Sequence, residues 1–240
     1  MTDPYLEREL SRLILERDLL QKYQVEELAE IIKDVGFSCT QCGDCCTTRQ
    51  NGHVFLLQSD TDRALKICSD SLIPAPFFEI CDKAGRFYVS GYALRTKTDG
   101  SCVHLSEGRC RIYQDRFSIC RIYPYMLHRE PDEKGRLIFR QISGLNEHGS
   151  YHTEISDEEC LTIAQETIIY EKEWLNQMIS FYEAVKDLFQ ISGERHVRKI
   201  YDNQMREFSK GVPVQVFVYH DGRFISHTVS LTDYIGILPS

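Results

Sequence analysis

The sequence has little of what would place the protein at a membrane or on nucleic acid. No apolar run is long enough to span a bilayer, and Glu, Arg and Asp interrupt the first twenty residues, where a signal peptide needs an apolar core. Basic residues are in deficit, because 28 Lys and Arg stand against 36 Asp and Glu and give a formal charge of −8. That deficit argues against nucleic-acid and anionic-membrane partners. We therefore expect a cytosolic protein.

The sequence also lacks the short motifs by which common catalytic sites are recognised. It contains no glycine-rich phosphate loop, no G-x-S-x-G nucleophile elbow and no H-E-x-x-H zinc helix. No glycine-rich motif for S-adenosylmethionine stands out, and the C-x3-C-x2-C spacing of radical enzymes is missing. Whether the protein is an enzyme is therefore left open.

The cysteine content is unusual in a composition that is otherwise ordinary for a globular protein. The chain is 42% hydrophobic and 27% charged, and its 240 residues are enough to bury a core without covalent staples. It nevertheless contains ten cysteines. In a reducing cytosol, thiols gathered at short spacings are more often metal ligands or redox groups than disulfides. We therefore expect the cysteines to carry the chemistry.

The pattern of apolar residues predicts an α+β fold, in which an irregular cysteine-rich metal-binding core is flanked by an N-terminal helix and by a C-terminal helical part with a β-hairpin. The parts are expected at residues 1–36, 37–150 and 151–240. Apolar residues recur at helical spacing over Asp3–Asp34, either as one helix or as two that break near Gln24, with Gly36 as the stop. The other elements expected are helices over Ser59–Cys68, from Ser156 to Phe189 and over Glu194–Ser209, strands over His53–Leu57, Phe87–Lys97 and Arg136–Leu145, and a hairpin over Val214–Ser230 with a type I′ turn at Asp221-Gly222.

Two groups of cysteines are the predicted metal- and cofactor-binding residues. The first follows the pattern C-x2-C-x2-C-C and consists of Cys39, Cys42, Cys45 and Cys46. The second consists of Cys102, Cys110 and Cys120. A C-x2-C turn bends the chain so that two thiolates converge on one ion, and distant cysteines then complete the coordination sphere, as in zinc and iron–sulfur sites.

The adjacent pair Cys45 and Cys46 limits how these thiols can be shared. Neighbouring side chains of extended backbone point to opposite faces, so both can bind one ion only in a tight turn. Either one ligates and the other packs beside it, or the two serve different corners or different sites. Seven thiols exceed the usual four ligands, which allows one site with spares or two sites that recruit Cys68, Cys81 or a histidine. Cys160 lies on an apolar helix face and is expected to be buried.

The region from Phe37 to Pro124 resembles a known family, the CxxCxxCC zinc- or iron-chelating domains, also called YkgJ-like cysteine-cluster proteins. The resemblance rests on the pattern F-x-C-x2-C-G-x-C-C, then C-x-x-L, then C-x-I-Y-x-x-R-x-x-x-C-R-x-Y-P. The matching residues are Phe37, Cys39, Cys42, Gly43, Cys45, Cys46, Cys102, Leu105, Cys110, Ile112, Tyr113, Arg116, Cys120, Arg121, Tyr123 and Pro124. One position departs from the pattern, since Phe117 stands where the family usually has proline.

The resemblance implies a metal-chelating domain whose cysteines bind an iron–sulfur cluster or zinc. Because seven thiols outnumber those of one zinc site, we favour an iron–sulfur cluster of the [4Fe–4S] type, with zinc as the alternative. The expected function is that of an accessory or maturation protein that binds another protein and acts in electron transfer or in assembly of that partner. Two alternatives remain, a protein lysine methyltransferase-like enzyme with a cluster, because the domain type occurs in flagellin lysine methylases, and a structural zinc-binding interaction module.

Histidines and arginines near the cysteines are the remaining candidates. His148 and His152 stand four residues apart within Asn146–Glu154, but Gly149 favours a solvated loop there over a second metal site. His104, between the second-group cysteines, could replace a thiolate. Cationic groups close to thiolates would lower the pKa of the thiols. Three arginines could do so, unless they face solvent or pair with Asp115 and Glu107: Arg111, Arg116 and Arg121.

Overall fold

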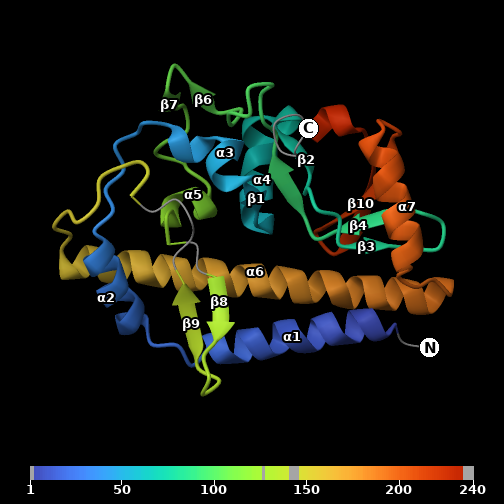
Figure 1. Cartoon of the computed structure of the whole chain (residues 1–240), viewed down its shortest axis with the longest axis horizontal. Coiled ribbons are helices and arrows are strands. Elements are labelled where there is room, and N and C mark those ends of the chain that lie inside the picture. Colours follow the sequence, from blue (N-terminus) through green and yellow to red (C-terminus); the bar gives the residue numbers. More distant parts are fainter. Residues whose placement is uncertain (1–2, 126–127, 141–145, 235–240) are drawn as a thin grey trace. The chain divides into compact units, whose positions relative to one another are not determined.

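The computed structural model describes residues 3–125, 128–140 and 146–234 (Figure 1). Helices and short β-strands occur together, which confirms the predicted α+β class. The chain forms two compact units, each made of separate segments. Unit 1 consists of residues 1–13, 47–103 and 177–240, and unit 2 of residues 14–46 and 104–176. Two helices, α1 (Pro4–Leu20) and α6 (Asp157–Ser192), contribute residues to both units.

Unit 1 contains two small β-sheets. The first is antiparallel, in the order β1 (Phe55–Leu56), β5 (Tyr92–Leu94) and β2 (Leu72–Pro74). The second has the order β11 (Arg223–Val229), β10 (Val214–His220), β4 (Phe87–Val89) and β3 (Ile80–Cys81). Within it, β10 pairs with β4 in parallel and with β11 antiparallel. The single strand expected over Phe87–Lys97 is therefore two strands that belong to different sheets.

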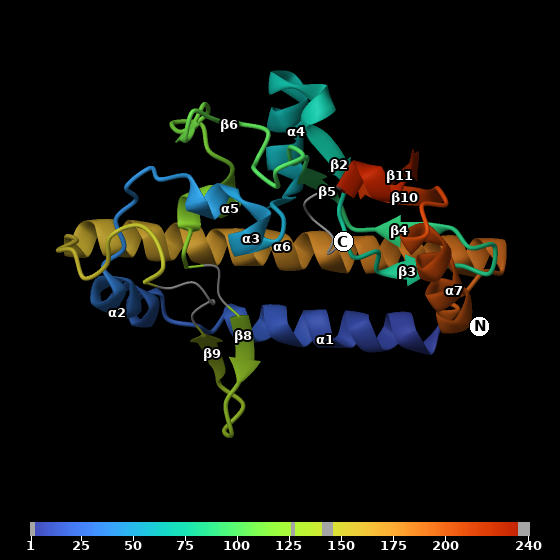
Figure 2. The same ribbon diagram turned by 45° about the horizontal axis from the view of Figure 1, so that its top comes forward.

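The remaining elements of unit 1 are short helices. They are α3 (Thr48–Asn51), α4 (Gln58–Ile67), η2 (Ser69–Ser71), α7 (Arg198–Ser209) and η3 (Leu231–Tyr234). Helix α7 lies beside β3 and β4 (Figure 2), and the backbone amide of Val197, its N-cap residue, donates to the carbonyl of Cys81 over 3.0 Å. The predicted helices over Ser59–Cys68 and Glu194–Ser209 are thus present, the second beginning four residues later than expected.

The hairpin β10–β11 confirms the predicted turn. Asp221 and Gly222 have φ angles of 49° and 71°, both in the left-handed region that a type I′ turn requires. The strands pair from Val214 opposite Val229 to His220 opposite Arg223. On one face of β10, the side chains of Val214, Val216 and Val218 are buried, because alternate residues of a strand share a face.

An aromatic cluster forms the core of unit 1. The ring of Phe78 lies 4.7 Å from that of Phe87, 5.6 Å from that of Phe208 and 6.0 Å from that of Tyr234. The Tyr234 hydroxyl is buried and donates to the carbonyl of Pro74 over 3.1 Å, which satisfies its polar end. The cluster therefore joins residues of the central segment to residues near the end of the described chain.

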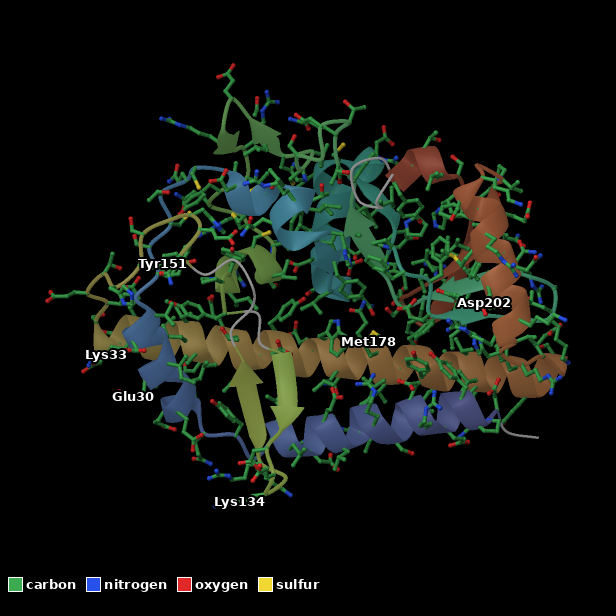
Figure 3. All side chains as sticks on the ribbon, viewed as in Figure 1. Glu30, Lys33, Lys134, Tyr151, Met178 and Asp202 are labelled. Atoms are coloured by element: carbon green, nitrogen blue, oxygen red, sulfur yellow. The ribbon has the colours of Figure 1, made fainter. Side chains whose placement is uncertain are left out.

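Unit 2 combines helices with two-stranded ribbons. Its elements, besides the shared helices, are α2 (Val25–Val35), η1 (Asp44–Cys46), β6 (Leu105–Ser106), β7 (Arg109–Cys110), α5 (Ser118–Ile122), β8 (His128–Pro131) and β9 (Leu137–Arg140). Helix α2 buries Leu28, Ile32 and Val35. Lys33 on its outer face (Figure 3) contacts Asp157 at the start of α6, with 2.6 Å between Nζ and Oδ1.

The helix boundaries follow their capping residues closely. Of the two forms expected at the N-terminus, the structure has the one with a break, and Gln24 is the N-cap of α2. Gly36 ends α2 with φ 53°, as predicted for a C-terminal stop. At the start of α6, the backbone amide of Glu159 donates to Ser156 Oγ over 3.2 Å, as in a capping box. The strand expected over Arg136–Leu145 is β9, and residues 141–145 lie outside the described residues.

Candidate metal centre

The first cysteine group occupies a loop of unit 2 that begins where α2 ends. Gly36 turns the chain out of the helix, and its amide donates to the carbonyl of Ile32 over 2.9 Å. The loop closes in the 3₁₀ turn η1, where the amide of Cys46 donates to the carbonyl of Gly43 over 2.9 Å. Gly43 has φ 84°, a conformation that favours glycine. A tight turn therefore surrounds the adjacent cysteines.

The turn η1 brings the two adjacent sulfurs to the same side of the backbone. Sγ of Cys45 and Sγ of Cys46 are 4.0 Å apart, within hydrogen-bonding range for thiols. This hydrogen bond and, to a smaller extent, the positive charge of Arg116 together lower the pKa of the Cys45 thiol to about 7, against the opposing effect of burial. A substantial fraction of Cys45 is therefore thiolate at neutral pH, and the thiolate is the form that binds metals.

Backbone and side-chain groups also surround Cys39. The amide of Gln41 points at Cys39 Sγ over 3.4 Å. Burial raises the pKa of the Tyr113 hydroxyl, and a hydrogen bond with the Cys39 thiol raises it further. The guanidinium carbon of Arg116 lies 4.0 Å from the centre of the Tyr113 ring, and Arg116 Nε donates to the Tyr113 carbonyl over 3.0 Å. Of the three arginines that the sequence offers for tuning the thiols, Arg116 is thus held in place close to them.

The β6–β7 hairpin packs against the cysteine loop within unit 2. A Cβ atom on Gly43 would lie 3.0 Å from Leu105 Cδ1 and 3.2 Å from the Gly108 carbonyl oxygen. Such distances are tighter than ordinary van der Waals contact, so a side chain here would push its neighbours away by a few tenths of an ångström. The position therefore needs glycine for two reasons, its φ angle and its neighbours.

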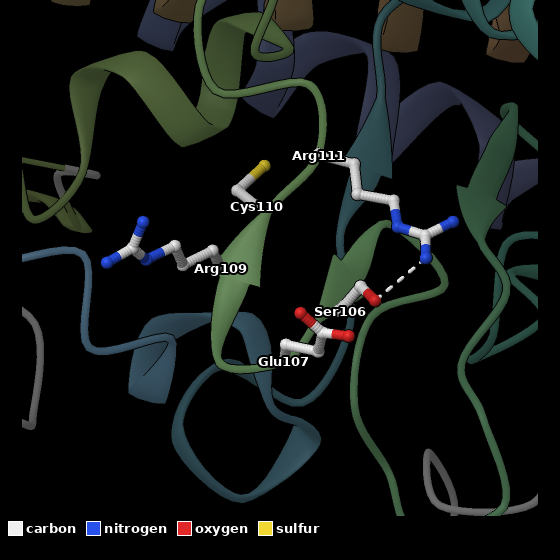
Figure 4. A pocket seen from close by; sticks show the side chains of 5 residues that line it. All are labelled: Ser106, Glu107, Arg109, Cys110 and Arg111. Atoms are coloured by element: carbon white, nitrogen blue, oxygen red, sulfur yellow. Dashed lines mark hydrogen bonds between the residues drawn. The ribbon is translucent and has the colours of Figure 1, made fainter.

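Cys110 lies on β7 at the wall of an open hollow of about 430 Å³ (Figure 4). The hollow is lined by Ser106, Glu107, Arg109, Cys110 and Arg111. Arg111 Nη2 donates to Ser106 Oγ over 2.8 Å, so this guanidinium is held by the hairpin itself. Cys110 is half-buried in this partly cationic surrounding.

Cys120 lies on α5, and its surroundings explain the departure from the family pattern. Phe117, the N-cap residue of α5, is fully buried, and its ring lies 5.9 Å from that of His104. Its backbone has φ −64°, which is the angle that proline imposes. The phenylalanine therefore keeps a proline-like backbone and adds a buried ring.

The seven predicted cysteines are divided between the units. Six belong to unit 2, and Cys102 belongs to unit 1, where its backbone bridges to Thr96. All ten cysteines of the chain lie among the described residues, and none forms a disulfide. In this described part, no three His, Cys, Asp or Glu side chains are close enough together to hold a metal ion. Binding by the six thiols of unit 2 would therefore require some of them to move closer.

The three remaining cysteines differ in exposure. Cys160 is 1% exposed on α6, which confirms the expected buried position. Cys81 is buried, and its burial raises the pKa of its thiol to about 12. Cys68 is exposed at the C-terminal end of α4. Both Cys68 and Cys81 belong to unit 1.

His148 is a neighbour of the cysteine loop that the sequence pattern did not reveal. The solvated loop expected at residues 146–154 is wrong for this residue, because His148 is only 9% exposed. Its Nε2 lies 2.7 Å from the Tyr123 hydroxyl, and the two rings are stacked with 5.4 Å between centroids. The Cys45 and Cys42 thiols contribute, after burial, to raising the pKa of the Tyr123 hydroxyl. The Tyr123–His148 pair is therefore one contact between this loop and the surroundings of the thiols, and no pattern in a single sequence reports it.

A comparison with protein-family models matches residues 38–172 to the CxxCxxCC family, described as a "putative zinc- or iron-chelating domain". No curated protein and no solved structure matches the chain. In the part of the chain that is described, no helix has both the length and the apolar character needed to cross a membrane. Because the family match spans more than half of the 240 residues, the chain belongs to the CxxCxxCC family of zinc- or iron-chelating domains.

Proposed function

We propose that the protein binds iron through the thiols of unit 2, as an iron–sulfur cluster, and serves as an accessory or maturation protein for another protein. The observation that carries the metal centre is the donor set: six thiols in one unit, one of them with its pKa lowered to about 7. Thiolates are the ligands that iron–sulfur clusters and zinc prefer. The residues that would hold the metal are Cys39, Cys42, Cys45, Cys46, Cys110 and Cys120, with Cys102 of unit 1 as the seventh candidate.

The surroundings of these thiols support a thiolate site over a set of buried, inert cysteines. A backbone amide points at Cys39 Sγ, and the guanidinium of Arg116 acts on Cys45, so both donors and positive charge are available to stabilise thiolates. An iron–sulfur cluster held here would supply one-electron transfer. The chain itself supplies the thiolates, and the positive charge of Arg116 offsets part of their negative charge.

The separation of Cys45 and Cys46 favours a second candidate, a site in which both bind one metal ion. Two thiolates on a tetrahedral ion with metal–sulfur bonds of about 2.3 Å have sulfurs about 3.8 Å apart. The observed 4.0 Å is close to this value. Zinc, or one iron of a [2Fe–2S] cluster, takes two thiolates in this way, whereas each iron of a [4Fe–4S] cluster takes one. In a [4Fe–4S] protein, only one of the pair would therefore ligate.

Metal and sulfide analysis after anaerobic purification separates these candidates. An iron–sulfur protein should be brown and contain iron and labile sulfide in equal amounts, with four of each per chain for [4Fe–4S] and two for [2Fe–2S]. Colourless, zinc-loaded protein would overturn the iron–sulfur proposal and support the structural zinc module, in which removal of the metal by a chelator should unfold the domain.

Serine variants identify the ligands, and purification identifies the partner. Cys45→Ser and Cys46→Ser should both lose metal if the pair shares one ion, whereas only one of them should do so in a [4Fe–4S] protein. Cys68→Ser, at an exposed cysteine of unit 1, is the matched control and should keep the full metal content. The accessory role is tested by anaerobic affinity purification, in which a protein should be retained by the wild type and lost from whichever of the Cys45→Ser and Cys46→Ser variants has lost its metal.

A further inference from the structure

The loop that contains His148 is attached to the chain immediately before the first cysteine. Ser38 and Ser150 exchange backbone hydrogen bonds of 2.8 and 3.0 Å. Two residues before Ser38, the carbonyl of Gly36 accepts a hydrogen bond from the amide of Thr153 over 3.0 Å. The ring of Phe37 lies 5.3 Å from that of Tyr151, which is labelled in Figure 3. The loop is therefore fixed against the stem of the cysteine loop.

This attachment leaves His148 buried with one nitrogen unsatisfied. Its Nε2 is engaged by the Tyr123 hydroxyl at 2.7 Å, whereas its buried Nδ1 has no hydrogen-bond partner among the described residues. A buried polar atom without a partner is unfavourable, so such an atom is expected to have a partner in the functional protein. His148 lies two residues before Ser150, whose backbone pairs with Ser38 next to Cys39, so a partner of Nδ1 would lie near the stem of the cysteine loop.

The hydrogen bond to Tyr123 specifies what Nδ1 can do. When Nε2 carries the proton and donates it to the Tyr123 oxygen, Nδ1 presents a lone pair. A metal-binding histidine has this arrangement, because its other ring nitrogen usually donates to an oxygen that fixes the tautomer and the orientation of the ring. His104 also has a buried nitrogen, Nε2, without a partner among the described residues, and its ring packs against that of Phe117.

We propose that His148 is a nitrogen ligand of the metal bound by the thiols of unit 2, that it binds through Nδ1, and that Tyr123 orients it. The inference rests on the proposed function, since it requires that the thiols bind a metal. It assigns the site a mixed sulfur and nitrogen donor set. It also gives the loop at residues 146–153 a role, which is to carry a ligand to the stem of the cysteine loop.

Titration of the reduced, metal-free full chain with Co²⁺ under anaerobic conditions tests the inference. Wild-type protein should develop sulfur-to-cobalt charge-transfer absorption, and its absence would refute thiolate metal binding itself. His148→Ala should weaken Co²⁺ binding at least about tenfold, since ligands and their orienting partners contribute factors of this size. His148→Cys should retain Co²⁺ binding, because cysteine is also a ligand. Its charge-transfer absorption should exceed that of wild type by the contribution of one additional thiolate, and its cobalt d–d bands should shift to longer wavelength.

Two further variants separate ligation from a structural role. Tyr123→Phe removes only the hydroxyl, and should weaken Co²⁺ binding while leaving the d–d bands at the wild-type wavelengths, because the ligands are unchanged. His152→Ala, in the same loop but exposed, should bind as the wild type does. The inference is overturned if wild-type protein binds Co²⁺ through thiolates but the His148→Cys spectrum coincides with the wild-type one. It is equally overturned if His104→Ala, and not His148→Ala, changes the d–d bands.

Discussion

Replacing Glu79 with glutamine should remove a pH dependence from the stability of the protein. Glu79 belongs to unit 1, where its Oε1 accepts hydrogen bonds from Ser90 Oγ over 2.6 Å and from the Ser90 amide over 3.3 Å. Its Oε2 is buried and has no hydrogen-bond partner among the described residues. Burial raises the pKa of this carboxyl to about 7, and the Ser90 hydrogen bonds offset only part of that effect.

The sign and size of the effect follow from proton linkage. The unfolded chain releases this proton near the ordinary value of 4.5, whereas the folded chain holds it until about pH 7. Between these values the folded state binds more protons, so the free energy of unfolding falls as pH rises and changes no further above about pH 7. Each pH unit corresponds to ~1.4 kcal/mol, so the loss over this whole interval amounts to about 3.5 kcal/mol at most.

Urea denaturation at pH 5, 6, 7 and 8 measures this loss. From pH 5 to pH 8 the free energy of unfolding should fall in wild type but not in Glu79→Gln, because the amide has no proton to lose. The difference between the two proteins should therefore change in favour of the variant by up to about 3 kcal/mol. Glu183→Gln, an exposed glutamate on α6 in unit 1, is the matched control and should follow the wild-type pH dependence. A constant difference between Glu79→Gln and wild type across this pH range would refute the reasoning.

Three other substitutions test the packing and the charge described above. Gly43→Ala should lower Co²⁺ affinity and destabilise the protein by about 1–2 kcal/mol, as urea denaturation would measure, because its φ of 84° disfavours a side chain and a Cβ would crowd the β6–β7 hairpin. Phe78→Ala should cost about 3–5 kcal/mol in thermal denaturation, whereas Phe77→Ala should cost less than about 1 kcal/mol, since these rings are 4% and 61% exposed. Arg116→Gln should raise the pKa of Cys45 and slow its alkylation at pH 7, followed by mass spectrometry of that peptide.

Each of these has a control in the same chain. Gly222→Ala has a positive φ but nothing within 4 Å of the new Cβ, so it should destabilise the protein without lowering metal affinity. Equal losses for Phe77→Ala and Phe78→Ala would contradict the burial argument. Arg121→Gln changes an exposed arginine and should leave Cys45 alkylation unchanged, and an equal slowing by both arginine variants would point to net charge instead of a specific contact.

Local features of the fold were predictable because short-range chemistry sets them. Gly36 ends a helix since glycine adopts the left-handed conformation at little cost, and Asp221-Gly222 forms the type I′ turn for the same reason. The capping interaction of Ser156 likewise depends on residues within one turn. The metal-binding role was predictable because C-x2-C spacings act locally.

Long-range pairings could not be read from one sequence. The parallel pairing of β10 with β4 joins Val216 to Phe87, and no local pattern reports such a partner. Strands of two residues, such as β3 and β6, are too short to show periodicity. His148 was missed as a neighbour of the cysteine loop because its contact with Tyr123 depends on a loop that folds back on the stem. The seven-cysteine ligand set stays a prediction.

The two units are made of segments from different parts of the chain, and this determines the order in which they can be completed during synthesis on the ribosome. Unit 2 has all of its residues, including six of the candidate ligands, once position 176 has been synthesised. Unit 1 must wait for residues 177–240, because Tyr5 stacks on His196 at 4.6 Å and Glu7 pairs with Lys186 at 2.8 Å. The thiols are therefore available to a metal donor before unit 1 can fold. Truncation from the C-terminus would remove the contacts that Tyr5 and Glu7 make with residues 186 and 196. Because each unit consists of separate segments, neither can be isolated by cutting the chain at one position.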